Sequence, residues 1–307
     1  MKNKLYFLAL MAGVFWGTIG TFGRVLMDLG FQPIEVAFCR LFFGSAALIA
    51  YALWKRPKAL RITVKGLGYT LVIGIFSQAL FNLLYFSAIR KIGIAAAAVL
   101  LYTAPVFLAF LSRLLFQEQI SKLKGISIGL CVLGSFFAVT GGMLDLKVLD
   151  GIGVLMGLGA AICYAFLSVV SKQAMKELDE LTLSIYSFLI GWMMLIPLAQ
   201  PWAIVGKLDG LAPVLAVVGQ GIITSAVPYM LYMTAVRSGV ELTRAGVICS
   251  VELILSVVLA AVLFKEPLTL VKAMGIGLIF ISILLAGSPG IGKKWGRNFF
   301  HKRKYIA

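Results

Sequence analysis

The sequence predicts an all-α integral membrane protein with ten transmembrane helices. Of its 307 residues, 61% are hydrophobic and only 13% are charged, whereas soluble domains average about 25% charged residues. The apolar residues form continuous runs that are long enough to cross a bilayer as helices, which takes about 20 residues. The runs do not alternate between apolar and polar residues, as the strands of a membrane barrel would.

Ten segments qualify as spans. Short breaks rich in glycine, proline or charge separate them, such as residues 28–30, 56–58 and 207–210. The connections are too short for a soluble domain. The predicted spans are residues 5–23, 32–54, 66–89, 93–116, 124–142, 151–171, 181–200, 211–236, 240–264 and 270–287.

The first segment imitates a secretory signal peptide, because two lysines precede its apolar run. No clean small-residue cleavage site follows, and the segment has a counterpart at residues 151–172. We therefore predict that it is retained as the first transmembrane helix.

The basic residues predict the orientation. The formal net charge is +16, from 28 Lys and Arg against 12 Asp and Glu. With the N-terminus inside, 20 of these 28 fall in inside segments, 7 fall in outside segments, and Arg40 lies within a helix. Cytoplasmic loops carry such an excess. We therefore predict a multi-pass protein of the inner (plasma) membrane with both termini in the cytoplasm, and no nucleic-acid partner.

The two halves of the sequence repeat each other. Residues 74–90 align with residues 221–237 without a gap, and the ending FQEQIS at 116–121 aligns with FKEPLT at 264–269. In this register Glu118 falls on Glu266 and Ala104 falls on Glu252. In the first helix of each half, Trp16 and Arg24 fall on Tyr164 and Lys172.

Each repeat has five helices, an odd number, so the second repeat must be inverted in the membrane. We predict a first repeat at residues 1–143, a second at residues 150–288, and a basic cytoplasmic tail at residues 289–307. Inverted repeats place a substrate site near the midplane, between the halves, and permit alternating access. The tail is predicted to bind anionic lipid headgroups.

Glu252 is the leading candidate for function. It lies about 18 Å from either end of its span, at about 1.5 Å per residue, and a carboxylate at that depth is costly. It is either a structural acid bonded between packed helices, or a proton carrier or counter-charge for a cationic substrate group. Burial favours the neutral form of a carboxyl, so the group can exchange a proton. Ser256 lies one turn further along the same face.

Two polar faces occupy equivalent positions in the third and eighth helices. Gln78, Asn82 and Tyr85 share one face, and their counterparts Ser225, Tyr229 and Tyr232 share the other. They are either interhelical hydrogen-bonding residues or the lining of a shared cavity. The second interpretation is favoured, because the two faces are related by the repeat.

Aromatic residues deep in the spans add to this predicted cavity. Trp16, Tyr102 and Tyr164 lie away from the headgroup regions, where aromatic residues usually gather. Each alone is typical of core packing, but aromatic and amide groups together suit an amphipathic or aromatic metabolite. Pro105 and Pro228 are predicted to kink their helices and to free a carbonyl group.

Other side chains are expected to be structural. Arg40 is predicted to lie nearer the outer surface, and either to extend outward or to pair with Glu35, so that no fixed cation lies at the depth of Glu252. The four cysteines lie inside apolar spans with neither disulfide nor metal spacing, and the one histidine, His301, is in the tail. We expect no cofactor and no metal.

The ten helices in two inverted halves, with the paired endings Phe116–Ser121 and Phe264–Thr269, resemble the EamA-type members of the drug/metabolite transporter superfamily. The resemblance covers residues 5–287, and Trp16 and Arg40 lie where the family often has such residues. It implies a carrier for small metabolites, often an exporter of amino acids or related compounds, with helices around a central cavity.

The chain departs from the family pattern at Leu253, where a proline commonly follows the glutamate. It also lacks the helix-1 glutamate of the four-helix multidrug members, so their proton-exchange mechanism does not carry over. The predicted function is a secondary transporter, not an enzyme, that exports an amino acid or a related amphipathic or aromatic compound. Glu252 makes a proton one candidate for the coupling ion, which the sequence does not identify. The alternative is an intramembrane lipid-modifying enzyme, which would require a His, Asp or Cys cluster near one membrane face.

Overall fold

The computed structural model describes residues 2–143 and 150–288. The basic tail predicted at residues 289–307 lies outside this part of the chain. Every regular element in the described residues is helical, which confirms the all-α class. Nine helical segments are long and apolar enough to cross a membrane, and a tenth apolar helix, Ala104–Phe116, is shorter.

The first repeat comprises α1 (Lys2–Trp16), α2 (Ile19–Asp28), α3 (Pro33–Lys55), the short 3₁₀ helix η1 (Pro57–Leu60), α4 (Val64–Val72), the π-helical η2 (Ile73–Leu80), α5 (Phe81–Leu101), α6 (Ala104–Phe116) and α7 (Lys122–Thr140). The second comprises α8 (Gly151–Ala174), α9 (Glu180–Ala199), α10 (Pro201–Val205), α11 (Leu211–Gly221), the π-helical η4 (Ile222–Ala226), α12 (Val227–Arg237), α13 (Leu242–Cys249), α14 (Val251–Phe264) and α15 (Leu270–Gly287).

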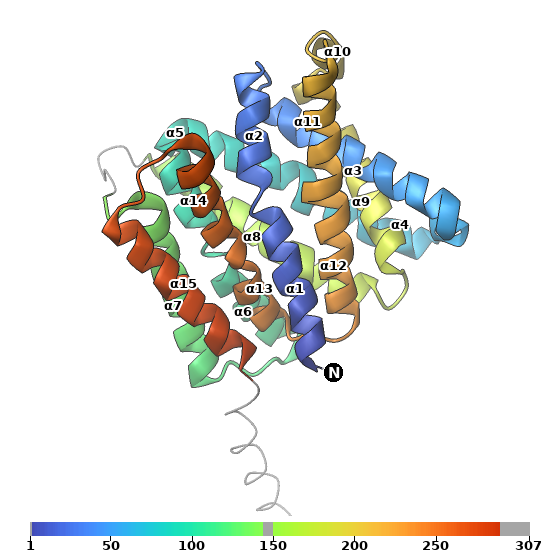
Figure 1. Cartoon of the computed structure of the whole chain (residues 1–307). Helices are drawn as coiled ribbons and strands as arrows, with labels where there is room; N and C mark the ends of the chain where they lie inside the picture. The colour runs from blue at the N-terminus through green and yellow to red at the C-terminus, as the bar shows by residue number, and fades with distance from the viewer. Residues whose placement is uncertain (1, 144–149, 289–307) are drawn as a thin grey trace, which may run out of the picture.

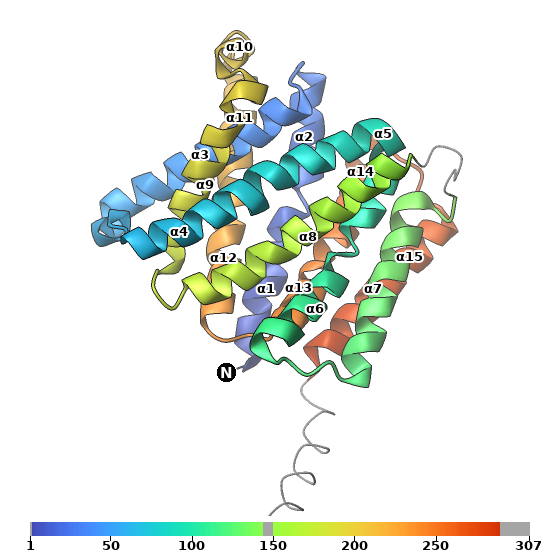
Figure 2. The same cartoon turned by 180° about the vertical axis from the view of Figure 1, so that it is seen from behind.

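The two repeats run in opposite directions. α1 begins and α15 ends at the same end of the molecule, which we call the terminal end, and α7 ends at the opposite end (Figure 1). α1 leads away from the terminal end, whereas its counterpart α8 leads towards it (Figures 1 and 2). The arrangement is the predicted pair of inverted five-helix repeats.

The repeats share one core. α1 packs against α12 and α13, α3 packs against α9 and α11, and α7 packs against α15. α5 and α8 lie side by side across the molecule (Figure 2). Each contact joins one repeat to the other, so the space at the centre is enclosed by both.

The second repeat begins at Asp150. Its carboxylate accepts hydrogen bonds from the backbone N–H of Gly153 at 3.2 Å and from Lys91 Nζ at 2.9 Å. The Lys91 ammonium group holds the pKa of this carboxyl below its ordinary value. An aspartate at this position satisfies an unpaired backbone donor of the first turn, which explains why α8 starts here.

Three predicted spans differ from the structure. Residues 5–23 form two helices separated at Gly17–Thr18, and residues 240–264 are interrupted at Ser250. The predicted boundary between residues 66–89 and 93–116 coincides with a kink at Gly93, where φ is +81° and the backbone is not helical, but the second of these spans is itself interrupted after Leu101.

Local hydroxyl groups support two of these breaks. Thr18 Oγ1 donates to the carbonyl of Phe15 at 2.7 Å, and Thr103 Oγ1 donates to the carbonyl of Leu100 at 2.6 Å. A threonine that satisfies a nearby carbonyl lets a helix end inside an apolar run. The interruption before Pro105 therefore lies at residues 102–103, and Pro105 stands in the first turn of the next helix.

Candidate functional site

A cavity of about 600 Å³ lies between the two repeats. Its lining includes Glu252 and Trp16 in the middle of the molecule and extends to Met27, Glu266 and Leu268 at the opposite end. Met27 and Leu268 are exposed, so the cavity reaches the surface there. The cavity is therefore accessible from the opposite end.

The structure brings together nine of the ten candidate residues. They line this cavity and are Trp16, Gln78, Asn82, Tyr85, Tyr102, Tyr164, Tyr229, Glu252 and Ser256. Ser225 does not line it: its side chain is fully buried beside Gly44 of α3. The prediction for Ser225 is wrong because η4 is π-helical, which changes the direction of its side chains relative to a regular α-helix.

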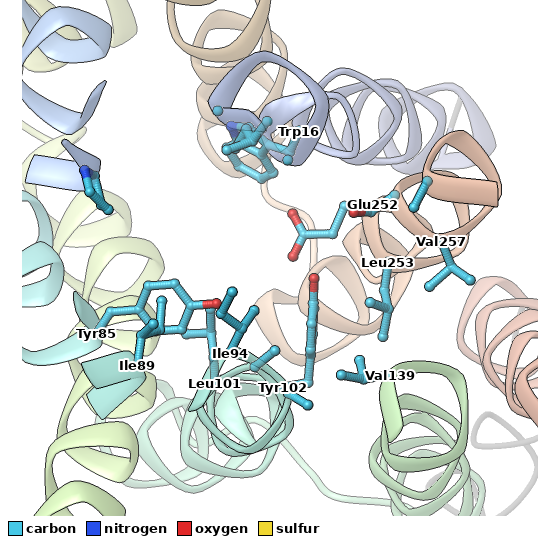
Figure 3. Close-up of a pocket in the computed structure, with 18 of the residues that line it drawn as sticks. Trp16, Tyr85, Ile89, Ile94, Leu101, Tyr102, Val139, Glu252, Leu253 and Val257 are labelled. Atoms are coloured by element: carbon cyan, nitrogen blue, oxygen red, sulfur yellow. The ribbon is translucent and has the colours of Figure 1, made fainter. Parts of the chain in front are cut away.

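The break at Ser250 places Glu252. It puts Glu252 in the first turn of α14, where the helix dipole favours a negative charge. Gly17, directly after α1, packs closely against this turn, because a Cβ added at Gly17 would lie 2.8 Å from the carbonyl oxygen of Glu252. The carboxylate points into the cavity, near the hydroxyl of Tyr102 and the indole of Trp16 (Figure 3).

The Glu252 carboxylate forms no hydrogen bond and no ion pair with any residue in the described part of the chain, whereas the carboxylates of Glu35 and Glu118 do. A structural acid would be bonded to backbone or hydroxyl groups of the helices around it. The geometry therefore favours the other alternative, a carboxylate that is available to a proton or a ligand.

Arg40 does not lie where its sequence position predicts. It does not pair with Glu35, because both carboxylate oxygens of Glu35 accept from Lys207 Nζ, at 2.9 and 2.6 Å. Nor does it extend outward: with Val36 and Ala37 it lines the same cavity as Glu252. Contrary to the expectation, a fixed cation therefore lines the same cavity as Glu252.

The physical reason is the helical period of α3. Val36 and Arg40 stand four residues apart and share the face that meets the cavity, whereas Glu35 is directed towards Lys207. The sequence held one usable signal, a permanent charge inside an apolar span, but it did not reveal that a distant lysine would occupy Glu35.

Amide and aromatic groups form one wall of the cavity. Gln78 Nε2 donates to the hydroxyl of Tyr229 at 2.9 Å, and Asn82 Nδ2 donates to the carbonyl of Gln78 at 2.5 Å. The Trp16 ring packs edge-on against Tyr229, with centroids 5.6 Å apart. These residues therefore both bond helices together and line the cavity, which combines the two interpretations.

Two amide oxygens in this wall have no partner in the described residues. They are Oε1 of Gln78 and Oε1 of Gln220, both fully buried residues on the cavity lining. A buried acceptor without a donor is costly. The sequence analysis did not single out Gln220.

A cluster at the terminal end joins the repeats beneath the cavity. Glu118 accepts from Lys172 Nζ at 3.0 Å, from the backbone N–H of Leu242 at 3.1 Å and from Thr243 Oγ1 at 3.3 Å. Lys172 Nζ also lies 4.3 Å from the centroid of the Phe116 ring. None of these residues lines the cavity. We call Glu118, Lys172, Phe116, Leu242 and Thr243 the terminal cluster.

The equivalent residues at the opposite end form a looser arrangement. Arg24 Nη1 lies 2.7 Å from Oε1 of Glu266, and the Arg24 guanidinium lies 4.2 Å from the centroid of the Phe264 ring. Both charged side chains are about half exposed, and Glu266 lines the mouth of the cavity. Arg24, Phe264 and Glu266 are named the opposite cluster.

An all-helical membrane protein with two inverted repeats around a central cavity has the architecture of a secondary transporter. The sequence profile of the EamA-like transporter family matches residues 3–140 and 151–288. The chain belongs to this family and therefore to the drug/metabolite transporter superfamily.

Relatives of similar length carry transporter names. The chain is 28% identical over 282 residues to an uncharacterized transporter of Archaeoglobus fulgidus, which covers 90% of this chain and 94% of the relative. It is 26% identical over 292 residues to the uncharacterized transporter YwfM of Bacillus subtilis, which covers 93% of this chain and 94% of the relative.

A crystal structure shares the fold. The match has a TM-score of 0.75 and covers 93% of this chain and 97% of that protein, at 18% sequence identity. This similarity supports the arrangement of the helices and nothing about the substrate or the site.

Proposed function

We propose that this protein moves a small metabolite through the central cavity by alternating access. The observation that carries the proposal is a cavity lined by both inverted repeats, with the Glu252 carboxylate in its middle. Such a site can be exposed to either side of a membrane if one repeat moves against the other. The aromatic and amide lining supports an amphipathic or aromatic compound, such as an amino acid or a relative of one, and we propose export as the direction.

The proposed location is the inner (plasma) membrane, with the terminal end in the cytoplasm. The excess of lysine and arginine near that end supports this orientation. Reporter fusions at Gly142 and Ala307 should then lie on opposite sides of the membrane. The tail at residues 289–307 is proposed to bind anionic headgroups.

We assign Glu252 one of two roles, a carrier of the coupling proton or a counter-charge for a substrate ammonium group. Its lack of a partner among the described residues supports both. The alternative of a lipid-modifying enzyme gains no support, because the relatives are named as transporters.

A ligand screen followed by counterflow tests the function. Purified protein is heated with individual metabolites, since a ligand that binds the native state raises its apparent stability. A hit is then loaded into proteoliposomes, and uptake of the labelled compound is measured. A carrier accumulates label only when unlabelled substrate is inside. Binding without counterflow would overturn the proposal.

A further inference from the structure

We propose that Arg40 binds the carboxylate of a zwitterionic substrate whose ammonium group is held by Glu252. The inference rests on the proposed transport function and assigns the chemistry of its site. Arg40 comes from the first repeat and Glu252 from the second, and both line one cavity. Neither forms an ion pair with a described residue, whereas Glu35, Glu118 and Glu266 all do.

Arg40 requires an anion. A guanidinium group keeps its proton in proteins, so Arg40 cannot become neutral as a carboxyl can. The carboxylate nearest to it in sequence, Glu35, is occupied by Lys207, and Glu266 at the cavity mouth is occupied by Arg24. The planar fork of five N–H donors matches a carboxylate in two parallel hydrogen bonds. A ligand that enters the cavity can supply that carboxylate.

Glu252 selects among the anions. A simple carboxylate would satisfy Arg40 but add a second negative charge beside Glu252, and a simple amine would leave Arg40 without a partner. A zwitterion compensates both charges and brings no net charge into a low-dielectric site, where an uncompensated charge is costly. Apolar lining from Phe81, Leu101 and Val257 is available for the rest of such a molecule.

The test compares three matched probes: L-leucine, its amine 3-methylbutylamine and its acid 4-methylpentanoate, with the L-phenylalanine series in parallel. Dissociation constants are measured by ligand-dependent thermal shift for the wild type, Arg40→Gln, Arg40→Lys and Glu252→Gln. Arg61→Gln, an exposed arginine remote from the cavity, controls for loss of one positive charge.

The wild type should prefer one zwitterion over both of its analogues. Arg40→Gln should weaken zwitterion binding by about 10- to 100-fold, the usual scale for a charge-assisted pair, and leave the amine nearly unaffected. Glu252→Gln should weaken binding of the zwitterion and of the amine, and leave binding of the acid nearly unaffected. Arg40→Lys should recover part of the loss, whereas Arg61→Gln should have no effect.

Two results would overturn the inference. One is Arg40→Gln that binds the zwitterion as tightly as the wild type does, which makes Arg40 structural. The other is a wild-type protein that binds an amine or an acid but none of the zwitterions. In that case counterflow of the bound compound still tests the transport function independently.

A second inference comes from the two clusters. We infer that they are alternating latches and that Glu266 docks onto the backbone N–H group of Ile94 when the cavity closes at the opposite end. In the repeat register, Glu118 falls on Glu266 and Leu242–Thr243 falls on Ile94–Ala95. In the terminal cluster Glu118 accepts from the backbone N–H of Leu242 and from Thr243 Oγ1, and its side chain is only 9% exposed.

The opposite end is prepared for the same contact. Ile94 follows Gly93, whose positive φ starts a new helical direction, so its N–H lies at the beginning of a helical segment as that of Leu242 does. Ile94 and Glu266 both line the cavity, and Arg24 is the hydrogen-bond partner that Glu266 has in the described residues. Closure of the mouth would bring Glu266 to this helix start, where its charge is favoured.

Ala95→Thr tests the latch, because it adds the hydroxyl that Thr243 supplies at the terminal end. The readout is the reaction rate of Ser256→Cys with a membrane-impermeant thiol reagent added at each end, in a protein whose four cysteines are replaced. Ala95→Thr should slow reaction from the opposite end and speed it from the terminal end, by severalfold. Glu118→Gln should shift both rates in the same directions, because it releases the terminal cluster.

Glu177→Gln is the matched control, since Glu177 pairs with Lys65 in an exposed ion pair away from the cavity. It should change neither rate. If Ala95→Thr and Glu118→Gln both leave the two rates as in the wild type, the clusters are static contacts and the latch inference is wrong.

Discussion

Lys172 Nζ lies 3.0 Å from Oε1 of Glu118, and this ion pair joins the first repeat to the second at the terminal end. Only 9% of the Glu118 side chain and 26% of the Lys172 side chain are exposed. The equivalent pair, Arg24 and Glu266, is 44% and 45% exposed. The same contact is thus made at both ends of the molecule, in a buried and in an exposed setting.

The two pairs should differ in strength. In a double-mutant cycle with glutamine at each position, Glu118–Lys172 should give a coupling free energy of about 1.5–3 kcal/mol, because a shielded charged hydrogen bond is strong. Arg24–Glu266 should give about 0.2–1 kcal/mol, as exposed pairs do. Unfolding in detergent measures both. Equal coupling energies would contradict the interpretation that the terminal end is closed and the opposite end is open.

The cavity lining should be accessible to water and the core should not. Cysteine at Tyr85 or Ser256 should react with a small hydrophilic thiol reagent, in a protein whose native cysteines are replaced, because both positions line the cavity. Cysteine at Ser225 should react at least tenfold more slowly, since this side chain is fully buried outside the lining. Equal rates at all three positions would mean that the cavity is not hydrated.

Gly17 should be sensitive to one added methyl group. A Cβ there would lie 2.8 Å from the Glu252 carbonyl oxygen and from Leu255 Cβ, so Gly17→Ala should destabilise the protein by about 1–3 kcal/mol, as overpacking does. Gly129→Ala is the control, because its helical site is open and alanine should be neutral or slightly stabilising. The two changes should shift the melting temperature in opposite directions, and a neutral Gly17→Ala would mean that Gly17 does not pack closely against the Glu252 turn.

Glu252→Gln should keep the fold but lower transport and flatten its dependence on pH between about 5 and 8. The amide is nearly isosteric but can neither carry a proton nor hold an ammonium group. Glu252→Asp should retain part of the activity. Counterflow at several pH values measures this. Glu252 would be a structural acid if Glu252→Gln transports normally across that pH range and Glu252→Leu merely expresses poorly.

Much of the fold could be predicted because bilayers impose strong rules. The apolar runs predicted the helices, the register between Glu118 and Glu266 predicted the repeat, and the odd number of helices in each repeat predicted the inversion. The breaks at Thr18 and Ser250 could not be predicted, since they depend on hydroxyl groups bonding nearby carbonyls and on the close approach of Gly17. Composition continues unchanged through both breaks.

The candidate site was predictable where a polar residue had no neighbour to satisfy it, as at Glu252. The predicted pairing of Arg40 with Glu35 was wrong because Glu35 instead pairs with Lys207, which lies far away in the sequence. Ser225 was misplaced because a π-helical turn changes the direction of its side chain. Both errors arise from tertiary contacts or helix geometry that local spacing does not encode.

The central claim is that one cavity opens alternately at the two ends. Spin labels at Ile94 and Leu268 span the cavity mouth, and labels at Gln119 and Ser238 report on the terminal end, where both positions are exposed. Pulsed electron–electron resonance measures both distances, with and without a compound that sustains counterflow. The ligand should shorten the first distance and lengthen the second in the same fraction of molecules. Counterflow with both distances unchanged would contradict it.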